Sequence, residues 1–304
     1  MSRIHEALKK AAQERSAQLA AGVEPNFLEV VDAPRTEVPL REIEDAPVRG
    51  MPKIEGPAFL RFEDLAAKCA KPKWRIDPRM SAFEGEGGSH VGAERFRTLR
   101  SRLYQIAATR PLRSVLVTSS VPAEGKTYIA SNLAQSIVRQ TDRKVLLIDA
   151  DLRASRMHIA MGAPRTPGLS DYLRGEADEY KVIQKGSDAN LFLIAGGSEV
   201  SNPSELLLNE RMKRLLELAV PTFDWIIIDT PPALPVHDAS MLSGLCDGVL
   251  FVVRAGSTDH EVAAKASASF EDKNLLGVVL NRVESDLGYG GYYYSYPSGG
   301  EVKK

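Results

Sequence analysis

The sequence predicts an α/β fold in which helices cover both faces of a doubly wound, mostly parallel sheet. Three observations predict it: apolar runs of strand length recur along the chain, helical stretches alternate with them, and one run leads into a phosphate-binding loop. Near-continuous apolar runs are typical of parallel strands buried on both faces, and the alternation indicates helical crossovers between them. A chain of 304 residues can hold one large domain of this kind with appended segments.

The first 90 residues are predicted to lie outside that domain. Residues 1–20 are predicted to form an amphipathic helix. Its thin apolar stripe is too weak to fold alone, so we expect either a solvated helix or a docking helix for a partner. Residues 21–90 are predicted to be a mostly disordered linker, because they hold eight prolines and many charges. One short helix fits within the linker, around Phe62–Cys69.

The predicted domain covers residues 91–284. Its expected strands are Ser114–Thr118, Val145–Asp149, Leu191–Ala195, Trp225–Asp229, Gly248–Val253 and Gly277–Asn281. The expected helices are Ala93–Ala108, Lys126–Gln140, Ser204–Leu218, His237–Leu245 and His260–Asp272. Residues 285–304 are predicted to be a flexible tail.

The loop after the first strand fits the pattern G-x-x-x-x-G-K-[ST], except that Ser120 replaces the first glycine. In such a loop, backbone N–H groups and the N-terminus of the following helix surround the phosphates of a nucleotide. Lys126 would place its charge on the β- and γ-phosphates, and Thr127 would offer its hydroxyl to Mg²⁺. A strand before the loop and a helix after it are the context that this motif needs.

Two further apolar strands end in acidic residues. The run Val145–Ile148 leads to Asp149 and Asp151, and the run Ile226–Ile228 leads to Asp229. Because parallel strands finish at one edge of a sheet, these carboxylates should lie beside the phosphate loop. There they could hold Mg²⁺ or accept a proton from an attacking hydroxyl.

Five of the nine tyrosines of the chain gather in the predicted tail: Tyr289, Tyr292, Tyr293, Tyr294 and Tyr296. The glycines between them weaken any helix or strand, so we expect the phenols to be reachable from outside. A nucleotide site together with exposed phenols suggests an enzyme that phosphorylates its own end. Considered alone, the tail could instead be a low-complexity segment used for aromatic packing.

Composition limits the remaining classes of function. The net charge of −1 does not favour nucleic acid or an anionic membrane surface as a partner. Cys69 and Cys246 show neither disulfide nor metal spacing, which fits a reducing compartment. With no apolar run of the length of a membrane span and no signal-peptide segment, we expect a cytoplasmic protein.

The motifs taken together resemble those of the bacterial tyrosine kinases, specifically the cytoplasmic kinase chains of exopolysaccharide and capsule systems. That family carries a D-x-D-x-R motif after three apolar residues, which Asp149, Asp151 and Arg153 match. It also carries a D-x-x-P motif, which Asp229 and Pro232 match. The resemblance covers roughly residues 91–296, and the opening helix resembles the start of exosortase-associated members.

The resemblance implies a phosphate-loop NTPase fold of the deviant-Walker (ParA/MinD-like) class. ATPases of the ParA/MinD type carry a signature lysine five residues before the loop lysine, and Val121 occupies that place here. The predicted function is therefore an ATP-dependent protein-tyrosine autokinase that regulates exopolysaccharide biosynthesis or export. The alternative is a ParA/MinD-like ATPase switch without kinase activity.

The resemblance also implies the site residues, with ATP and Mg²⁺ as cofactors. Catalytic roles are expected for Lys126, Asp149, Asp151 and Asp229, and either Asp149 or Asp151 would accept the proton of the tyrosine. Nucleotide contacts are expected from Glu124, Gly125, Lys126, Thr127, Tyr128, Arg153 and Asn281. Magnesium ligands are expected from Thr127, Asp149 and Asp229.

Partners follow from the same resemblance. Glu94, Arg97 and Arg100 fit the E-x-x-R-x-x-R spacing with which the family builds rings of subunits, although without the family they would be a solvated charged face. The tail tyrosines would then be phosphorylated in trans within the ring. A transmembrane activator of the polysaccharide co-polymerase type would recruit the chain to the inner face of the plasma membrane, and a cognate tyrosine phosphatase could be a further partner.

Overall fold

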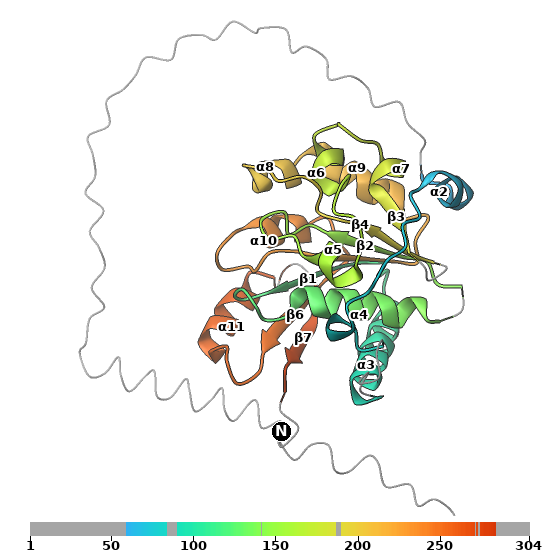
Figure 1. The fold of residues 1–304 in the computed structure, drawn as a ribbon. Helices are drawn as coiled ribbons and strands as arrows, with labels where there is room; N and C mark the ends of the chain where they lie inside the picture. Colours follow the sequence, from blue (N-terminus) through green and yellow to red (C-terminus); the bar gives the residue numbers. More distant parts are fainter. Residues whose placement is uncertain are drawn as a thin grey trace, which may run out of the picture. The chain divides into compact units, whose positions relative to one another are not determined.

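The computed structural model describes residues 59–83, 90–140, 142–186, 190–270, 272 and 274–283. The predicted helix at residues 1–20 and the tyrosine-rich tail at 285–304 lie outside the described residues. Figure 1 shows a central sheet with helices on both of its faces.

A seven-stranded sheet forms the centre of the described chain, in the strand order β3-β4-β2-β5-β1-β6-β7. The strands are β1 Ser114–Ser119, β2 Val145–Asp149, β3 Ile183–Lys185, β4 Leu191–Ile194, β5 Trp225–Asp229, β6 Gly248–Arg254 and β7 Leu275–Asn281. Every pairing is parallel except that of β3 with β4, which is antiparallel. This confirms the predicted doubly wound, mostly parallel sheet, and it adds a short edge strand that the sequence pattern did not indicate.

Helices pack on the two faces of the sheet. They are α2 Phe62–Lys68, the 3-10 helix η1 Pro78–Met80, α3 His90–Ala107, α4 Lys126–Val138, α5 Met157–Met161, α6 Leu169–Leu173, α7 Glu179–Val182, α8 Pro203–Leu207, α9 Glu210–Ala219, α10 Asp238–Ser243 and α11 His260–Ala268. Helices α3, α4 and α5 contribute to the hydrophobic core on one face, and α2, α6, α7, α9, α10 and α11 contribute to the core on the other.

The strand side chains alternate between these two cores. In β1, Val115 and Val117 join the core below α3 and α4, while Leu116 joins the opposite core. All three are fully buried. Because successive side chains of a strand point to opposite faces, a strand covered on both faces needs a continuous apolar run, which is the pattern found in the sequence.

Residues 59–83 belong to the folded body, so the prediction that the domain begins near Val91 is wrong for this segment. Leu60 and Leu65 are fully buried against the sheet, and Lys185 N donates to Ala70 O at 2.8 Å. Farther along, Arg75 N donates to Gly162 O at 3.2 Å, and Ala82 N to the Asn132 side chain at 2.6 Å. The prolines and charges hid these contacts because most buried residues of this segment stand singly among exposed or partly exposed ones.

Other differences also have local causes. The predicted helix Ser204–Leu218 is two helices, since Asn209 caps the start of α9 by accepting from Arg211 N at 2.6 Å. Strand β7 is not buried on both faces: Val278 is 52% and Leu280 62% exposed. As an edge strand, β7 has a neighbour on one side only. The predicted short helix around Phe62–Cys69 is confirmed as α2.

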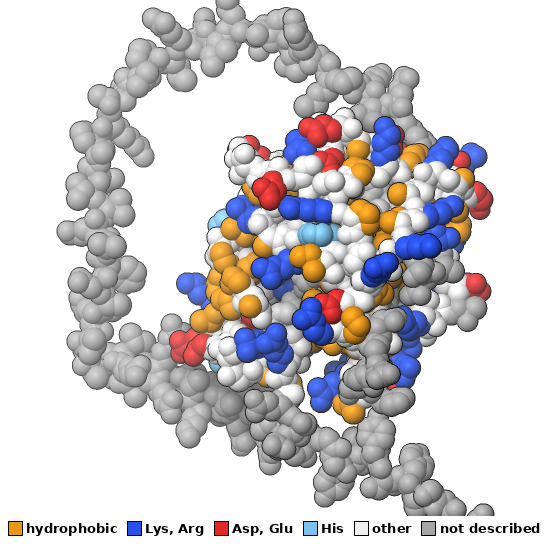
Figure 2. All heavy atoms as spheres, in the orientation of Figure 1, with side chains coloured by type: hydrophobic (Ala, Val, Ile, Leu, Met, Phe, Trp, Pro, Cys, Tyr) orange, Lys and Arg blue, Asp and Glu red, His pale blue; other side chains and the backbone are white. Residues whose placement is uncertain are grey.

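The surface of the described part is mixed in charge. On the face in Figure 2, Lys and Arg side chains form separate groups, with hydrophobic, acidic and uncharged side chains between them. None of the helices among the described residues is both long enough and apolar enough to span a bilayer.

Candidate active site

The carboxyl ends of β1, β5 and β2 lie side by side at one edge of the sheet, because β5 is hydrogen-bonded to both of the others. Asp149 and Asp229 are the last residues of β2 and β5 and are direct partners in the pairing of these strands. Asp229 is also level with Val117 of β1, just before the phosphate loop. The three predicted motifs therefore meet at one place.

The phosphate loop, residues 120–125, turns sharply between β1 and α4. Ala123 and Gly125 both adopt left-handed backbone conformations, with φ of 65° and 98°. Left-handed residues inside such a loop create a concave surface of backbone N–H groups that suits an anion. Gly125 suits this position because a φ of 98° strains any residue with a side chain, and a Cβ there would lie 2.1 Å from the Asn281 side-chain nitrogen unless Asn281 moved.

Lys126 and Thr127 open helix α4 directly after this loop. Lys126 is 7% exposed, and its charge lowers the pKa of Asp229 against the opposing effect of burial. The Thr127 hydroxyl donates to Asp229 Oδ2 at 2.6 Å. The loop, the lysine and the hydroxyl thus converge on the carboxylate at the end of β5.

The two paired carboxylates are fully buried, and this sets their protonation. Burial raises the pKa of Asp149 to about 6, against the lowering effect of hydrogen bonds from Ser155 and Met157. For Asp229, burial together with the nearby Asp149 charge raises the pKa to about 8. Ser155 Oγ donates to Asp149 Oδ2 at 2.7 Å, whereas Asp229 Oδ1 is buried without a hydrogen-bond partner.

The orphaned oxygen is the observation that tests whether this site suits Mg²⁺. A hydroxyl and two carboxylates are hard oxygen ligands, and the carboxylates repel each other until a cation lies between or beside them. Within the described residues, no group of three or more His, Cys, Asp or Glu side chains could hold a metal by itself. Mg²⁺ usually keeps several waters and binds substrate phosphates as well, so Thr127, Asp149 and Asp229 fit a site of that kind.

Asp151 and Arg153 follow Asp149 in the turn after β2. The Asp151 carboxylate is 7% exposed and accepts from Ala154 N at 3.0 Å. The Arg153 guanidinium instead binds the buried Asp238 at 2.8 Å and Ser204 Oγ at 2.7 Å. Its expected contact with the nucleotide has no support in these hydrogen bonds, which join the turn after β2 to α8 and α10.

Glu124, Tyr128 and Asn281, which were also predicted to contact the nucleotide, have different surroundings in the structure. The Glu124 side chain is 1% exposed and points into the protein, so only its backbone could meet a nucleotide. The Tyr128 ring packs against Phe96 of α3, with ring centroids 5.8 Å apart. Asn281, at the end of β7, donates from its amide to Glu124 O at 2.8 Å and so lies beside the phosphate loop.

The predicted interface residues lie on α3. Glu94 and Arg97 form an ion pair with both side chains about half exposed. Arg100 is partly buried and donates to Ser136 O of α4. Helix α3 is thus attached to the helix that begins with Lys126, while Glu94 and Arg97 remain accessible.

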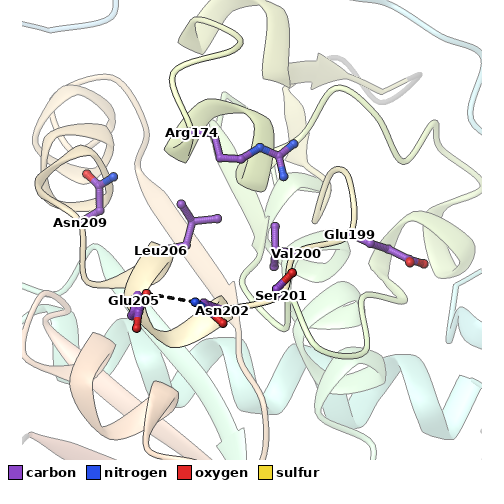
Figure 3. Close-up of a pocket in the computed structure, with 8 residues that line it drawn as sticks. All are labelled: Arg174, Glu199, Val200, Ser201, Asn202, Glu205, Leu206 and Asn209. Carbon is purple, nitrogen blue, oxygen red and sulfur yellow. Dashed lines mark hydrogen bonds between the residues drawn. The ribbon is translucent and has the colours of Figure 1, made fainter.

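A separate cavity of about 400 Å³ opens between α6 and α8, lined by Arg174, Glu199, Val200, Ser201, Asn202, Glu205, Leu206 and Asn209. Figure 3 shows the Asn202–Glu205 hydrogen bond on its wall. Arg174, the one cation of its lining, is paired with Asp171 and Glu176. None of the predicted site residues lines this cavity.

Residues that the sequence analysis missed support the predicted ones. Asp149 accepts hydrogen bonds from Ser155 and Met157, and Arg153 binds Asp238. Glu124 accepts a hydrogen bond from Thr258. Only Ser155 and Met157 could have been suspected, from their short spacing after Asp149. Asp238 and Thr258 come from distant parts of the chain and carry no motif.

The fold and the site define a nucleotide-binding protein of the phosphate-loop class. Residues 122–259 match the family model of an AAA domain. Over 207 residues the chain is 36% identical to the tyrosine-protein kinase YwqD of Bacillus subtilis, covering 66% of this chain and 87% of that one.

Larger kinases match over part of their length. The chain is 36% identical to the tyrosine-protein kinase etk of Escherichia coli, covering 62% of this chain and 26% of etk. A putative tyrosine-protein kinase in the cps region of Klebsiella pneumoniae is 34% identical, with 65% of this chain and 28% of that protein covered. The solved kinase domain of the Escherichia coli kinase superposes with a TM-score of 0.62 at 33% identity, covering 69% of this chain and 84% of that domain. The chain therefore belongs to the bacterial tyrosine-protein kinase family.

Proposed function

We propose that this kinase transfers the γ-phosphoryl group of ATP to its own C-terminal tyrosines, Tyr289, Tyr292, Tyr293, Tyr294 and Tyr296. The observation that carries the proposal is the pair Asp149 and Asp229, buried side by side where the phosphate loop ends, with Thr127 on one oxygen of Asp229 and no partner on the other. Such a pair is unfavourable on its own and becomes favourable beside a bound cation, which also binds the phosphates.

In the proposed reaction, the loop backbone and Lys126 hold the phosphates of ATP, and Asn281 would contact the adenine of the nucleotide. A bond forms between a tyrosine oxygen and the γ-phosphorus as the bond to the β-phosphate oxygen breaks, and ADP leaves. Mg²⁺, when bound by Thr127, Asp149 and Asp229, would neutralise charge on the β- and γ-phosphates. The task of the protein is alignment and charge neutralisation.

Asp151 is our choice for the residue that takes the proton of the tyrosine. Asp149 is fully buried, and both of its oxygens accept hydrogen bonds, from Ser155, Met157 and Asp151 N. Asp151 is slightly exposed. A carboxylate at the border of the site can meet an incoming hydroxyl, whereas one enclosed in hydrogen bonds and assigned to a metal is a poorer base. Replacing each by Asn and comparing pH–rate profiles would test this choice.

We further propose that the acceptor tyrosines belong to a neighbouring subunit. From Val283 to Tyr292 an extended chain spans about 30 Å at ~3.3 Å per residue, which is long enough to reach another active site. Glu94, Arg97 and Arg100 would form the ring contact, since arginine can bind a carboxylate of a neighbour with two hydrogen bonds.

Regulation of exopolysaccharide biosynthesis or export is the proposed role. The name of the Klebsiella pneumoniae relative places that protein in a cps region. On the family resemblance described above, a transmembrane activator of the polysaccharide co-polymerase type would recruit this chain to the inner face of the plasma membrane. A tyrosine phosphatase would reverse the modification.

The test uses two chains that are each defective in one part. A Lys126→Met chain with an intact tail is mixed with an active chain lacking residues 287–304, together with Mg-ATP and the cytoplasmic segment of the activator. Phosphotyrosine on the Lys126→Met chain supports transfer between subunits. Phosphotyrosine on the unchanged full-length protein, tested alone, but none on the Lys126→Met chain in the mixture would reject transfer between subunits. Absence of phosphotyrosine on the full-length chain with activator present would reject the kinase proposal.

A further inference from the structure

The inner side of the phosphate loop is held by a hydrogen-bonded network centred on the Glu124 carboxylate. Glu124 Oε2 accepts from Val121 N, within the same loop, at 2.8 Å. Glu124 Oε1 accepts from Thr258 Oγ1 at 2.6 Å and from Arg254 N at 3.2 Å. The carboxylate is 1% exposed, so these three donors replace the water that it would otherwise bind.

A second link joins the same loop to the end of β7. Asn281 Nδ2 donates to Glu124 O at 2.8 Å, and Ala255 N donates to Asn281 O at 2.9 Å. Asn281 also packs closely on Gly125, where a Cβ would lie 2.1 Å from the Asn281 side-chain nitrogen. The phosphate loop, the loop after β6 and the end of β7 are therefore one connected unit, which we call the Glu124 network.

The network stabilises a backbone shape that the loop would not prefer alone. Ala123 has a φ of 65°, a left-handed conformation that costs a residue with a side chain roughly 1–2 kcal/mol. Such a conformation persists only where its surroundings enforce it. Val121 and Glu124 lie on either side of Ala123, and the hydrogen bond between them closes the turn that contains it.

We propose that Glu124 and Thr258 are positioning residues for nucleotide binding: they fix the phosphate loop in its anion-binding shape before the nucleotide arrives. Neither side chain is assigned a contact with the phosphates; they act through the loop backbone. The inference rests on the proposed nucleotide site and adds to it a determinant of affinity, Thr258, that is distant from Lys126 in the sequence.

The test replaces Thr258 by Val, which keeps the shape of the side chain and removes the hydroxyl. Thr258→Ser restores the donor, and Ser257→Ala serves as the matched control, since Ser257 is an exposed hydroxyl residue of the same loop. The full chain is titrated with a fluorescent ATP analogue in the presence of Mg²⁺. We expect Thr258→Val to weaken binding about tenfold, as expected for one hydrogen bond to a charged group. Thr258→Ser and Ser257→Ala should bind like the unchanged protein.

Two further measurements separate positioning from a general loss of stability. In steady-state kinetics, Thr258→Val should raise KM for ATP about tenfold while kcat changes less than about threefold. In the nucleotide-free chain, amide hydrogen exchange should become faster in residues 119–125 but not in α9, because only the loop loses its support. This second measurement does not depend on the identity of the nucleotide.

The outcomes are distinct. Equal affinity and equal exchange for Thr258→Val and the unchanged protein would overturn the proposed positioning role and leave the nucleotide site intact. Faster exchange across the whole domain would also overturn it, since Thr258 would then be a general stabilising residue. Failure of the unchanged protein to bind the analogue would reject the proposed nucleotide site itself, and the positioning role with it.

Discussion

Two carboxylates at the same edge of the sheet, Glu124 and Asp229, are equally buried and have opposite surroundings. The two oxygens of Glu124 together accept hydrogen bonds from three donors, one in the phosphate loop and two at the end of β6 and in the loop after it. Asp229 has one donor, Thr127, while its Oδ1 has none and Asp149 repels it. Burial alone therefore does not identify a functional acid. The informative feature is an electrostatic requirement that the protein itself leaves unmet.

The largest effect is expected from removing the positive charge of Lys126, which acts on Asp229. Lys126→Met should lower tyrosine phosphorylation by about 100-fold or more, because charge develops on the phosphates without its nearest counter-charge. Phosphotyrosine formation over time with Mg-ATP and the activating segment measures this. Lys213→Met, an exposed lysine of α9, is the matched control and should keep its activity within about twofold.

The second prediction places the two carboxylates in direct contrast. Glu124→Ala should lower the free energy of unfolding by about 3 kcal/mol, since it leaves buried donors unpaired. At pH 8.5, Asp229→Asn should instead raise it by about 1 kcal/mol in the nucleotide-free protein, since it removes a repelled charge. Urea denaturation of both variants gives the two values. If both variants lost the same stability, the distinction between a satisfied and an unsatisfied carboxylate would be wrong.

The third prediction uses pH. The raised pKa values of Asp149, about 6, and Asp229, about 8, mean that the folded chain holds these protons more tightly than the unfolded chain. Their stabilising contribution is fully present below about pH 4, where an unfolded Asp titrates, and is lost as pH rises through about 6 to 8. Between about pH 4 and 6, the free energy of unfolding should fall by up to about 1.4 kcal/mol per pH unit for each of the two protons, and between about pH 6 and 8 for the Asp229 proton alone.

Magnesium nucleotide should reverse this trend, because it favours the ionised carboxylates. The rise in Tm caused by Mg-ADP should be larger at pH 8.5 than at pH 6. Thermal unfolding at the two pH values, with and without Mg-ADP, measures the difference. Asp229→Asn should show a weaker pH dependence, whereas an unchanged dependence would mean that other groups are responsible.

The smallest effect on stability is expected away from the sheet edge. Arg97→Ala removes a half-exposed partner of Glu94 and should change the free energy of unfolding by less than about 0.5 kcal/mol. If α3 forms the proposed ring contact, the same change should reduce the mass of the particle in solution. Light scattering after size-exclusion chromatography measures that mass; an assembly of unchanged mass would argue against this contact.

Much of the fold was predictable because its signals are local. The strands β2 and β5 begin and end at the predicted residues, since an apolar run that finishes in Asp marks both the buried stretch and its end. The helix α4 starts at Lys126 as the motif requires. By contrast, α5, α6 and α7 each span at most five residues, too few to show a helical period, and were not predicted.

The candidate site divides in the same way. The positions of Lys126, Thr127, Asp149 and Asp229 at one edge follow from a parallel sheet, in which strand ends meet. The orientation of Glu124 and Arg153 does not follow, because their partners Thr258 and Asp238 are distant in the sequence. A motif gives the position of a side chain along the chain, but not its hydrogen-bond partner.

The sequence by itself determined that β1, β2, β4, β5 and β6 are buried strands, where β2 and β5 end, and which chemical groups stand at those two ends. Only the tertiary structure decided that Glu124 points inward, that residues 59–83 pack on the domain and that β7 is an exposed edge. Periodicity and spacing record how each residue faces its immediate neighbours in the chain. Hydrogen-bond partners and exposure depend on segments that folding brings together from far apart, and no local pattern encodes them.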